Sequence, residues 1–113
     1  MIRFEETYRA DEESYESVSI KAVVDGKKVG VMALMVSNNE AYIERIDVVE
    51  GERNKGYGTQ MLQYAVSLYG YTYIAPDNED AKRLYDRIGS EMNGADYGRV
   101  GLYVDQGYGV YEL

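Results

Sequence analysis

The chain contains no cysteine, no histidine and no tryptophan among its 113 residues. Disulfide bonds, thiol nucleophiles, imidazole bases and the usual zinc ligands are therefore excluded, and no metal site is expected. Any acid–base chemistry falls to carboxylates, tyrosines or lysines. Positive charge is also scarce, because 12 basic residues stand against 20 acidic ones and give a net charge of −8. That charge disfavours a nucleic-acid-binding protein and favours cationic partners.

Long apolar runs are missing as well. No segment approaches the roughly 18 consecutive apolar residues of a membrane span. The first six residues, Met1 to Glu6, have no signal-peptide pattern. A soluble, cytoplasmic protein with no membrane partner is expected. A chain of 113 residues has room for one hydrophobic core only, so residues 1–113 are predicted to form a single domain.

The most informative stretch is a turn with two glycines and two cations, Arg53-Asn54-Lys55-Gly56-Tyr57-Gly58-Thr59. The apolar run Ile43 to Val49 before it predicts a strand, and apolar residues with helical spacing after it, from Met61 to Tyr69, predict a helix that stops at Gly70. Glycine lets a backbone turn its N–H groups toward an anion, and a helix N-terminus adds partial positive charge. The stretch is therefore predicted to bind phosphate, although ordinary solvated charges would also explain Arg53 and Lys55.

The remaining patterns predict strands and one further helix. Asn78 is a good N-cap, and Ala81, Leu84, Tyr85 and Ile88 lie on one helical face that ends at Gly89. The stretch Ala10 to Ser17 could form a short helix or a loop. Period-two patterns and turn residues predict strands at Ile2–Tyr8, Val18–Val24, Val29–Val36, Ala41–Val49 and Tyr71–Ala75, and a closing hairpin of Tyr97–Val104 and Tyr108–Leu113. The order predicts a mixed sheet flanked by helices.

Two of these segments carry a family likeness. Arg53-x-x-Gly56-x-Gly58 resembles the acetyl-coenzyme A pyrophosphate loop of the GNAT N-acetyltransferases, and Asn78 to Gly89 resembles their second signature helix. The resemblance implies an α/β (α+β) GNAT-like acyl-CoA N-acyltransferase fold with a mixed, mostly antiparallel sheet. The sheet would be splayed where the strand Ala41–Val49 parts from Thr72–Ala75.

The resemblance also implies a role for each site residue. The backbone N–H groups from Arg53 to Thr59 would hold the pyrophosphate of acetyl-coenzyme A. The main chain of Ile46 and Val48 would pair with the pantetheine arm, and Asn78 would contact the cofactor from the other side. Tyr85 matches the family tyrosine that protonates the leaving thiolate, and a phenol with a pKa near 10 is protonated at neutral pH. Periodicity alone would place Tyr85 in the core, and the two roles are compatible.

Glu44 is the candidate general base, because it interrupts an apolar strand and is expected on the same face as Tyr42, Ile46 and Val48. A structural ion pair with Arg45 or Lys28 is the competing explanation, and water can also deprotonate an amine. The sequence departs from the family at Ser90, where an aromatic residue is usual. Arg9 to Ser17 is also too short for the two acceptor-side helices of the family. This shortened N-terminal region predicts a site that is open, or that a second subunit completes in a homodimer.

The function predicted from these residues is direct acetyl transfer from acetyl-coenzyme A to an amine, since no cysteine can carry an acyl-enzyme. The acidic pairs and runs Glu5-Glu6 and Asp11-Glu12-Glu13 favour a cationic acceptor, either a polyamine-like small molecule or a protein lysine. The alternative is a catalytically weak or inactive module of the same fold that binds coenzyme A or another protein. A third reading, an acidic mimic of nucleic acid, depends on net charge alone.

Overall fold

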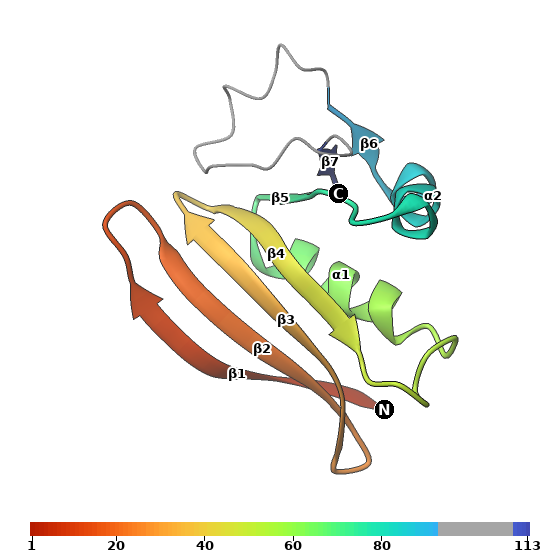
Figure 1. The fold of residues 1–113 in the computed structure, drawn as a ribbon. Helices are drawn as coiled ribbons and strands as arrows, with labels where there is room; N and C mark the ends of the chain where they lie inside the picture. Colours follow the sequence, from red (N-terminus) through yellow and green to blue (C-terminus); the bar gives the residue numbers. More distant parts are fainter. Residues whose placement is uncertain (93–109) are drawn as a thin grey trace.

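The computed structural model describes residues 1–92 and 110–113, which form one sheet with two helices (Figure 1). From the first strand to the second helix, the predicted order of elements is found, with most predicted ends off by a few positions. The two-residue strand that follows the second helix was not predicted. In chain order the elements are β1 (Ile2–Asp11), β2 (Glu16–Val24), β3 (Lys27–Ser37), β4 (Glu40–Val48), α1 (Tyr57–Leu68), β5 (Tyr71–Ile74), α2 (Glu79–Ile88), β6 (Ser90–Glu91) and β7 (Tyr111–Glu112). Neither α1 nor α2 is long and apolar enough to cross a membrane.

The described strands form a sheet in the order β1-β2-β3-β4-β5-β7-β6. The first four strands are antiparallel neighbours joined by short connections. β5 is parallel to β4, because the chain returns through α1 before it pairs again. β7 then pairs antiparallel with both β5 and β6. The predicted mixed, mostly antiparallel sheet is therefore confirmed.

β4 and β5 separate partway along β4. Their pairing starts at Glu40 with Tyr71 and ends at Ile43 with Ile74. β4 continues to Val48, so its second half runs beyond the last residue that pairs with β5. This is the geometry that the predicted splay requires, because among the described residues that edge of β4 pairs with no strand beyond Ile43.

The main core lies between α1 and one face of the first four strands (Figure 1). Alternate residues of β2, namely Val18, Ile20 and Ala22, are buried there, as the period-two pattern predicts. Met61 and Leu62 of α1 belong to the same cluster, with 2% or less of their surface exposed. Burial of one such side chain contributes roughly 1.5–3 kcal/mol, so this face of α1 fixes the helix on the sheet.

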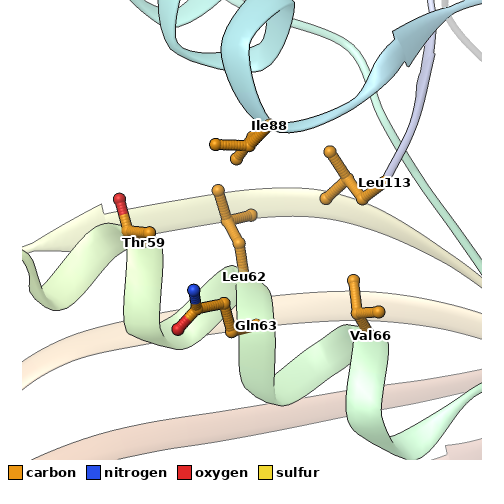
Figure 2. A pocket seen from close by; sticks show the side chains of 6 residues that line it. All are labelled: Thr59, Leu62, Gln63, Val66, Ile88 and Leu113. Carbon is orange, nitrogen blue, oxygen red and sulfur yellow. The ribbon is translucent and has the colours of Figure 1, made fainter.

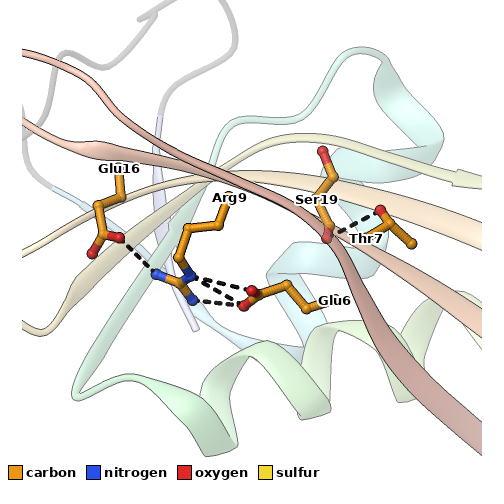
Figure 3. A network of polar contacts seen from close by, with 5 residues as sticks. All are labelled: Glu6, Thr7, Arg9, Glu16 and Ser19. Carbon is orange, nitrogen blue, oxygen red and sulfur yellow. Dashed lines mark hydrogen bonds and ion pairs between the residues drawn. The ribbon is translucent and has the colours of Figure 1, made fainter.

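The stretch between the first two strands is a turn and not a helix, so the helical alternative for Ala10–Ser17 is wrong. β1 continues in register with β2 until Asp11 pairs with Glu16, and the Glu12 amide donates to the Tyr15 carbonyl oxygen at 2.8 Å. Arg9 stabilises this hairpin end, because it lies between Glu6 and Glu16 and bonds both carboxylates (Figure 3). Ala10 and Asp11 therefore pair as strand residues with Ser17 and Glu16, and the residues between them are too few for a helix.

Two glycines end the helices for a reason that differs from the usual one. A C-terminal glycine commonly adopts a positive φ, whereas Gly89 has φ −146° and Gly70 is not among the glycines with positive φ. A Cβ atom at Gly70 would lie 2.1 Å from Asn39 Nδ2, and one at Gly89 would lie 2.7 Å from the Glu112 carbonyl oxygen. The clash at Gly89 is with backbone, so close packing requires glycine there, whereas at Gly70 the Asn39 side chain would have to move.

Part of the predicted closing hairpin, Tyr97–Val104, lies outside the described residues. The other strand, predicted at Tyr108–Leu113, is found at Tyr111–Glu112. It pairs Tyr73 with Glu112 and Ile74 with Tyr111. The last residues of the chain therefore lie between β5 and β6.

Candidate functional site

The loop between β4 and α1, residues 49–56, has an unusual backbone. Gly51, Asn54 and Gly56 have φ angles of 92°, 65° and 83°, a region that favours glycine and tolerates asparagine. The Glu52 amide donates to the Val49 carbonyl oxygen at 2.9 Å and tightens the loop. The loop thereby delivers the chain to the start of α1 with Gly56 in the left-handed region.

The two helix N-termini differ in what satisfies them. α2 has its own cap, because Asn78 Oδ1 accepts a hydrogen bond from the Ala81 amide at 2.8 Å, and Glu79 and Asp80 stand in its first turn. α1 begins after Gly56 with no side-chain cap and no acidic residue in its first turn. Backbone N–H groups at such a start need partners from outside the helix. The N-terminus of α1 is thus prepared for an anion, whereas that of α2 is already satisfied.

A groove of about 530 Å³ connects these features. It brings together three segments, the second half of β4, the loop with the first turn of α1, and the start of α2. Nine of the ten residues predicted to bind the cofactor line it. The lining consists of Ile46, Asp47, Val48, Glu52, Arg53, Asn54, Gly56, Tyr57, Gly58, Thr59, Asn78 and Leu84.

Lys55 is the predicted binding residue outside this lining. Its Nζ atom lies 3.0 Å from Glu52 Oε2, and Lys55 lines a neighbouring pocket of about 250 Å³ together with Lys27. Arg53 is the only cation among the described residues that line the groove. Its Nε donates to the Val48 carbonyl oxygen at 3.3 Å and bridges the loop to the end of β4.

Glu44 occupies a β-bulge. Ala33 of β3 pairs with Arg45, whereas the next residue, Leu34, pairs with Ile43, so Glu44 is the extra residue on β4. An extra residue reverses the alternation of side chains beyond it. Glu44 itself is exposed, and Arg45 forms its ion pair with Asp47.

The bulge overturns the expected shared face of Glu44, Tyr42, Ile46 and Val48. Tyr42 belongs to one core cluster, whereas Ile46 and Val48 pack against the other, beneath α1. The prediction was wrong because a period-two reading assumes an unbroken strand. Ile46 and Val48 reach the groove because of the same reversal.

Tyr85 lies on α2 and is 5% exposed. Its ring meets that of Tyr111 edge to face, with 6.0 Å between the ring centroids. Burial raises the pKa of Tyr85 to about 12, and the negative potentials of Asp77 and Tyr42 add to the shift. The pKa of Tyr85 is thus affected by Tyr42, which lies on β4, the strand that separates from β5. Tyr85 does not line the 530 Å³ groove, whereas its neighbour Leu84 does.

Sequence reasoning missed the contact that fixes α2 against the end of the chain. Tyr111 is fully buried, its hydroxyl donates to Asp86, and Lys82 Nζ donates to that hydroxyl at 3.0 Å. The spacing of Lys82 and Asp86 was visible as a pair of opposite charges on one helical face. Nothing in the sequence distinguished Tyr111 from the other twelve tyrosines.

A second, apolar pocket of about 230 Å³ lies beside the groove, between α1, the end of α2 and the last residue (Figure 2). Leu62 and Val66 of α1 face Ile88 and Leu113 across it, and Gln63 supplies a polar group at its edge. Thr59 lines both spaces. The two spaces therefore meet at the first turn of α1.

The sequence model of the acetyltransferase (GNAT) family matches residues 2–89. No curated protein sequence matches the chain. Similar solved structures include the ribosomal-protein-S18-alanine N-acetyltransferase of Escherichia coli, with a TM-score of 0.67 and 14% identity over 100% of this chain and 93% of that one. A GNAT family acetyltransferase from Elizabethkingia anophelis, solved with acetyl-CoA bound, has a TM-score of 0.67 and 13% identity over 99% and 97%.

A third structure, a GNAT family acetyltransferase from Staphylococcus aureus Mu50, has a TM-score of 0.65 and 19% identity. The match covers 85% of this chain and 66% of that one, so the chain spans just under two thirds of its length. At these identities the structures show a shared fold. The predicted fold class is therefore confirmed.

Proposed function

The chain belongs to the GNAT acetyltransferase family, and on this premise we propose that it binds acetyl-coenzyme A and transfers the acetyl group directly to an amine. The observation that carries the proposal is the uncapped N-terminus of α1, which opens into the groove. The N–H groups at the start of α1 and the helix dipole together favour an anion with several acceptor oxygens. The pyrophosphate of coenzyme A is such an anion.

The second half of β4 supports the placement of the pantetheine arm. Ile46 and Val48 line the groove, beyond the last residue of β4 that pairs with β5. An extended arm that carries amide groups can add to such a strand by backbone hydrogen bonds. The thioester would then lie toward Tyr42 and Tyr85, where the two strands separate.

At that end, the amine nitrogen attacks the thioester carbonyl carbon, the carbon–sulfur bond breaks, and the departing thiolate takes a proton. Tyr85 is the proposed donor of that proton, because its raised pKa keeps the phenol protonated. The proton lost by the amine passes to water or to Glu44. Glu44 is exposed, so both routes lead to solvent.

The acceptor is proposed to be a cationic amine, such as a polyamine-like molecule or a protein lysine. Glu5 forms ion pairs with Arg3 and Lys21 at 3.7 and 3.5 Å, and Glu6 pairs with Arg9 at 2.7 Å. Attraction of a cation therefore depends mainly on the run at 11–13. Steering by these charges would weaken as salt rises, so the specificity constant for the amine should fall with added salt.

The acidic run does not oppose the anionic cofactor. Asp11 is at the same level of the sheet as the start of β4, with β2 and β3 between them, because Asp11 pairs with Glu16, Glu16 with Val36, and Val36 with Ala41. The loop at 49–56 follows the other end of this strand of nine residues. The separation is roughly 25–30 Å at about 3.3 Å per residue, which exceeds the Debye length of about 8 Å at physiological salt.

Isothermal titration with acetyl-coenzyme A tests the first step. Binding with a Kd in the span of about 1 μM to 1 mM that is typical of enzyme substrates would support the proposal, and no binding would contradict it. Thiol release measured with polyamines, aminoglycosides, amino acids and lysine peptides tests the second step. Tight cofactor binding without release for any amine would favour the inactive binding module instead.

A further inference from the structure

Glu52 is a buried carboxylate in the loop that precedes α1. Its side chain is 10% exposed, which is rare for an acidic residue unless it is paired. Its two oxygens take different partners, since Oε1 accepts from Lys27 Nζ at 2.5 Å and Oε2 accepts from Lys55 Nζ at 3.0 Å. Both lysines are themselves more than half exposed. The three side chains form what is here called the Lys27–Glu52–Lys55 clamp.

The clamp joins two segments that are far apart in sequence. Lys27 is 25 residues before Glu52 and begins β3, directly after the Asp25–Gly26 turn. The Val49 amide adds a backbone tie to the same strand, because it donates to the Val29 carbonyl oxygen at 2.8 Å. The loop at 49–56 is thus attached to β3 at its start and, through Glu52, at its middle.

This attachment matters because ordering the loop backbone costs conformational entropy. Gly51, Asn54 and Gly56 all have positive φ angles, and glycine loses more conformational freedom on ordering than any other residue. A loop that is ordered only when a ligand arrives reduces the affinity for that ligand, whereas a loop that is ordered beforehand does not.

We propose that the Lys27–Glu52–Lys55 clamp holds the loop at 49–56 in the shape that binds the cofactor pyrophosphate, so that Glu52 and Lys27 are positioning residues. This inference rests on the proposed function. Neither residue needs to touch the cofactor for the clamp to work. Lys27 does not line the groove, and Glu52 carries the wrong charge to bind phosphate.

Simple electrostatics predicts the opposite effect for Glu52. If the two lysines bound phosphate directly, Glu52 would compete with it, and Glu52→Gln would release both cations and remove a negative charge from the groove. Binding of acetyl-coenzyme A would then become tighter. The clamp predicts weaker binding for the same substitution, so the sign of the change separates the two explanations.

The experiment compares Glu52→Gln and Lys27→Met with the matched controls Glu91→Gln and Lys28→Met. The controls make the same chemical changes at exposed positions outside the loop. Titration with acetyl-coenzyme A should give a Kd about tenfold higher for the two clamp variants and within about twofold of wild type for the controls. Lys27→Arg, which keeps the ion pair, should restore the affinity. The KM for acetyl-coenzyme A should rise with the Kd, while the KM for the amine should not.

Amide hydrogen exchange of residues 50–57 in the cofactor-free protein provides a second readout. Exchange should be faster in Glu52→Gln and Lys27→Met and unchanged in the controls. Unchanged exchange, or tighter cofactor binding by Glu52→Gln, would overturn the inference. If the wild-type protein failed to bind acetyl-coenzyme A, the proposed function would fall, and loop exchange confined to the clamp variants would still support the ordering of the loop by the clamp.

Discussion

Tyr85→Phe tests the proposed proton donor with little disturbance of the fold. The side chain is 5% exposed, and its ring packs edge to face on Tyr111. Phenylalanine keeps that ring and removes only the hydroxyl group. The free energy of unfolding should therefore change by no more than about 1.5 kcal/mol, the net contribution of a typical hydrogen bond. Any large effect on turnover then reflects chemistry.

The size of that effect follows from the protonation state. The pKa of Tyr85 is about 12, chiefly because the phenol is buried. At pH 7 only about one molecule in 10⁵ is ionised, so the donor is present throughout the usual assay range. Positioned proton transfer contributes a rate factor of about 10²–10⁴, which corresponds to about 2.7–5.4 kcal/mol of activation free energy. The kcat of Tyr85→Phe should fall at least about 100-fold, while the Kd for acetyl-coenzyme A should not change.

The assay is thiol release under saturating acetyl-coenzyme A between pH 6 and 10, with an amine that the wild type accepts. Tyr8→Phe serves as the control, because Tyr8 is an exposed tyrosine on β1. The wild-type rate should show no loss attributable to Tyr85 ionisation in this range. A Tyr85→Phe enzyme with a kcat within about twofold of wild type would refute the proton-donor role. A loss of kcat that is matched by an equal loss of folded protein would also refute the proton-donor role, because unfolding would then explain it.

Three further predictions concern the loop and the helix starts. Gly56→Ala should weaken acetyl-coenzyme A binding in titration calorimetry, because the φ of 83° at this position costs a residue other than glycine about 1–2 kcal/mol. A steric clash is not the cause, since the added Cβ would meet no protein atom within 4 Å. An unchanged Kd would contradict this prediction. Asn78→Ala should lower the free energy of unfolding in urea by about 1 kcal/mol, the usual value of an N-cap, and an unchanged midpoint would argue against the cap. The pKa of Glu52 is held below its usual 4.5, first by the bond from Lys27, so the pair stabilises the protein above that pH and the stabilisation is lost as pH falls through the lower folded value. The difference in unfolding free energy between wild type and Glu52→Gln should accordingly shrink on acidification, and a difference independent of pH would count against the pairing.

Local signals were sufficient for most of the architecture. The Asp25–Gly26 turn has the two positive φ angles that a tight hairpin needs. The cap at Asn78 and the apolar face of α2 could be predicted from the sequence, because a cap and a helical period involve residues within a few positions of one another. The glycine turn before α1 could be predicted for the same reason. Each of these features is decided by neighbours in sequence, and the structure contains each of them.

Some of these local features also have partners that the sequence did not identify. The predicted cap at Asn78 is confirmed, because its side-chain oxygen accepts from the Ala81 amide. The residue also lines the groove, and its contact with the cofactor stays a prediction. Gly70 was predicted as a helix stop, and α1 ends at Leu68, just before it. The Asn39 side chain packs closely against Gly70, so a larger residue there would displace that side chain. The type of a residue indicates which local structures it can form. The residues that it contacts come from distant parts of the chain and cannot be read from its neighbours in sequence.

The sequence by itself therefore determined the order of strands and helices, the glycine turn and the capped start of α2, because short-range sterics and hydrogen bonding set them. Tertiary structure alone decided three things: the bulge at Glu44, the burial of Glu52 beneath two lysines, and the place of Tyr111 between β5 and β6. Each depends on a strand register or a contact between segments that are distant in the chain. Such contacts form only when the whole sheet closes, and no periodicity within one segment records them.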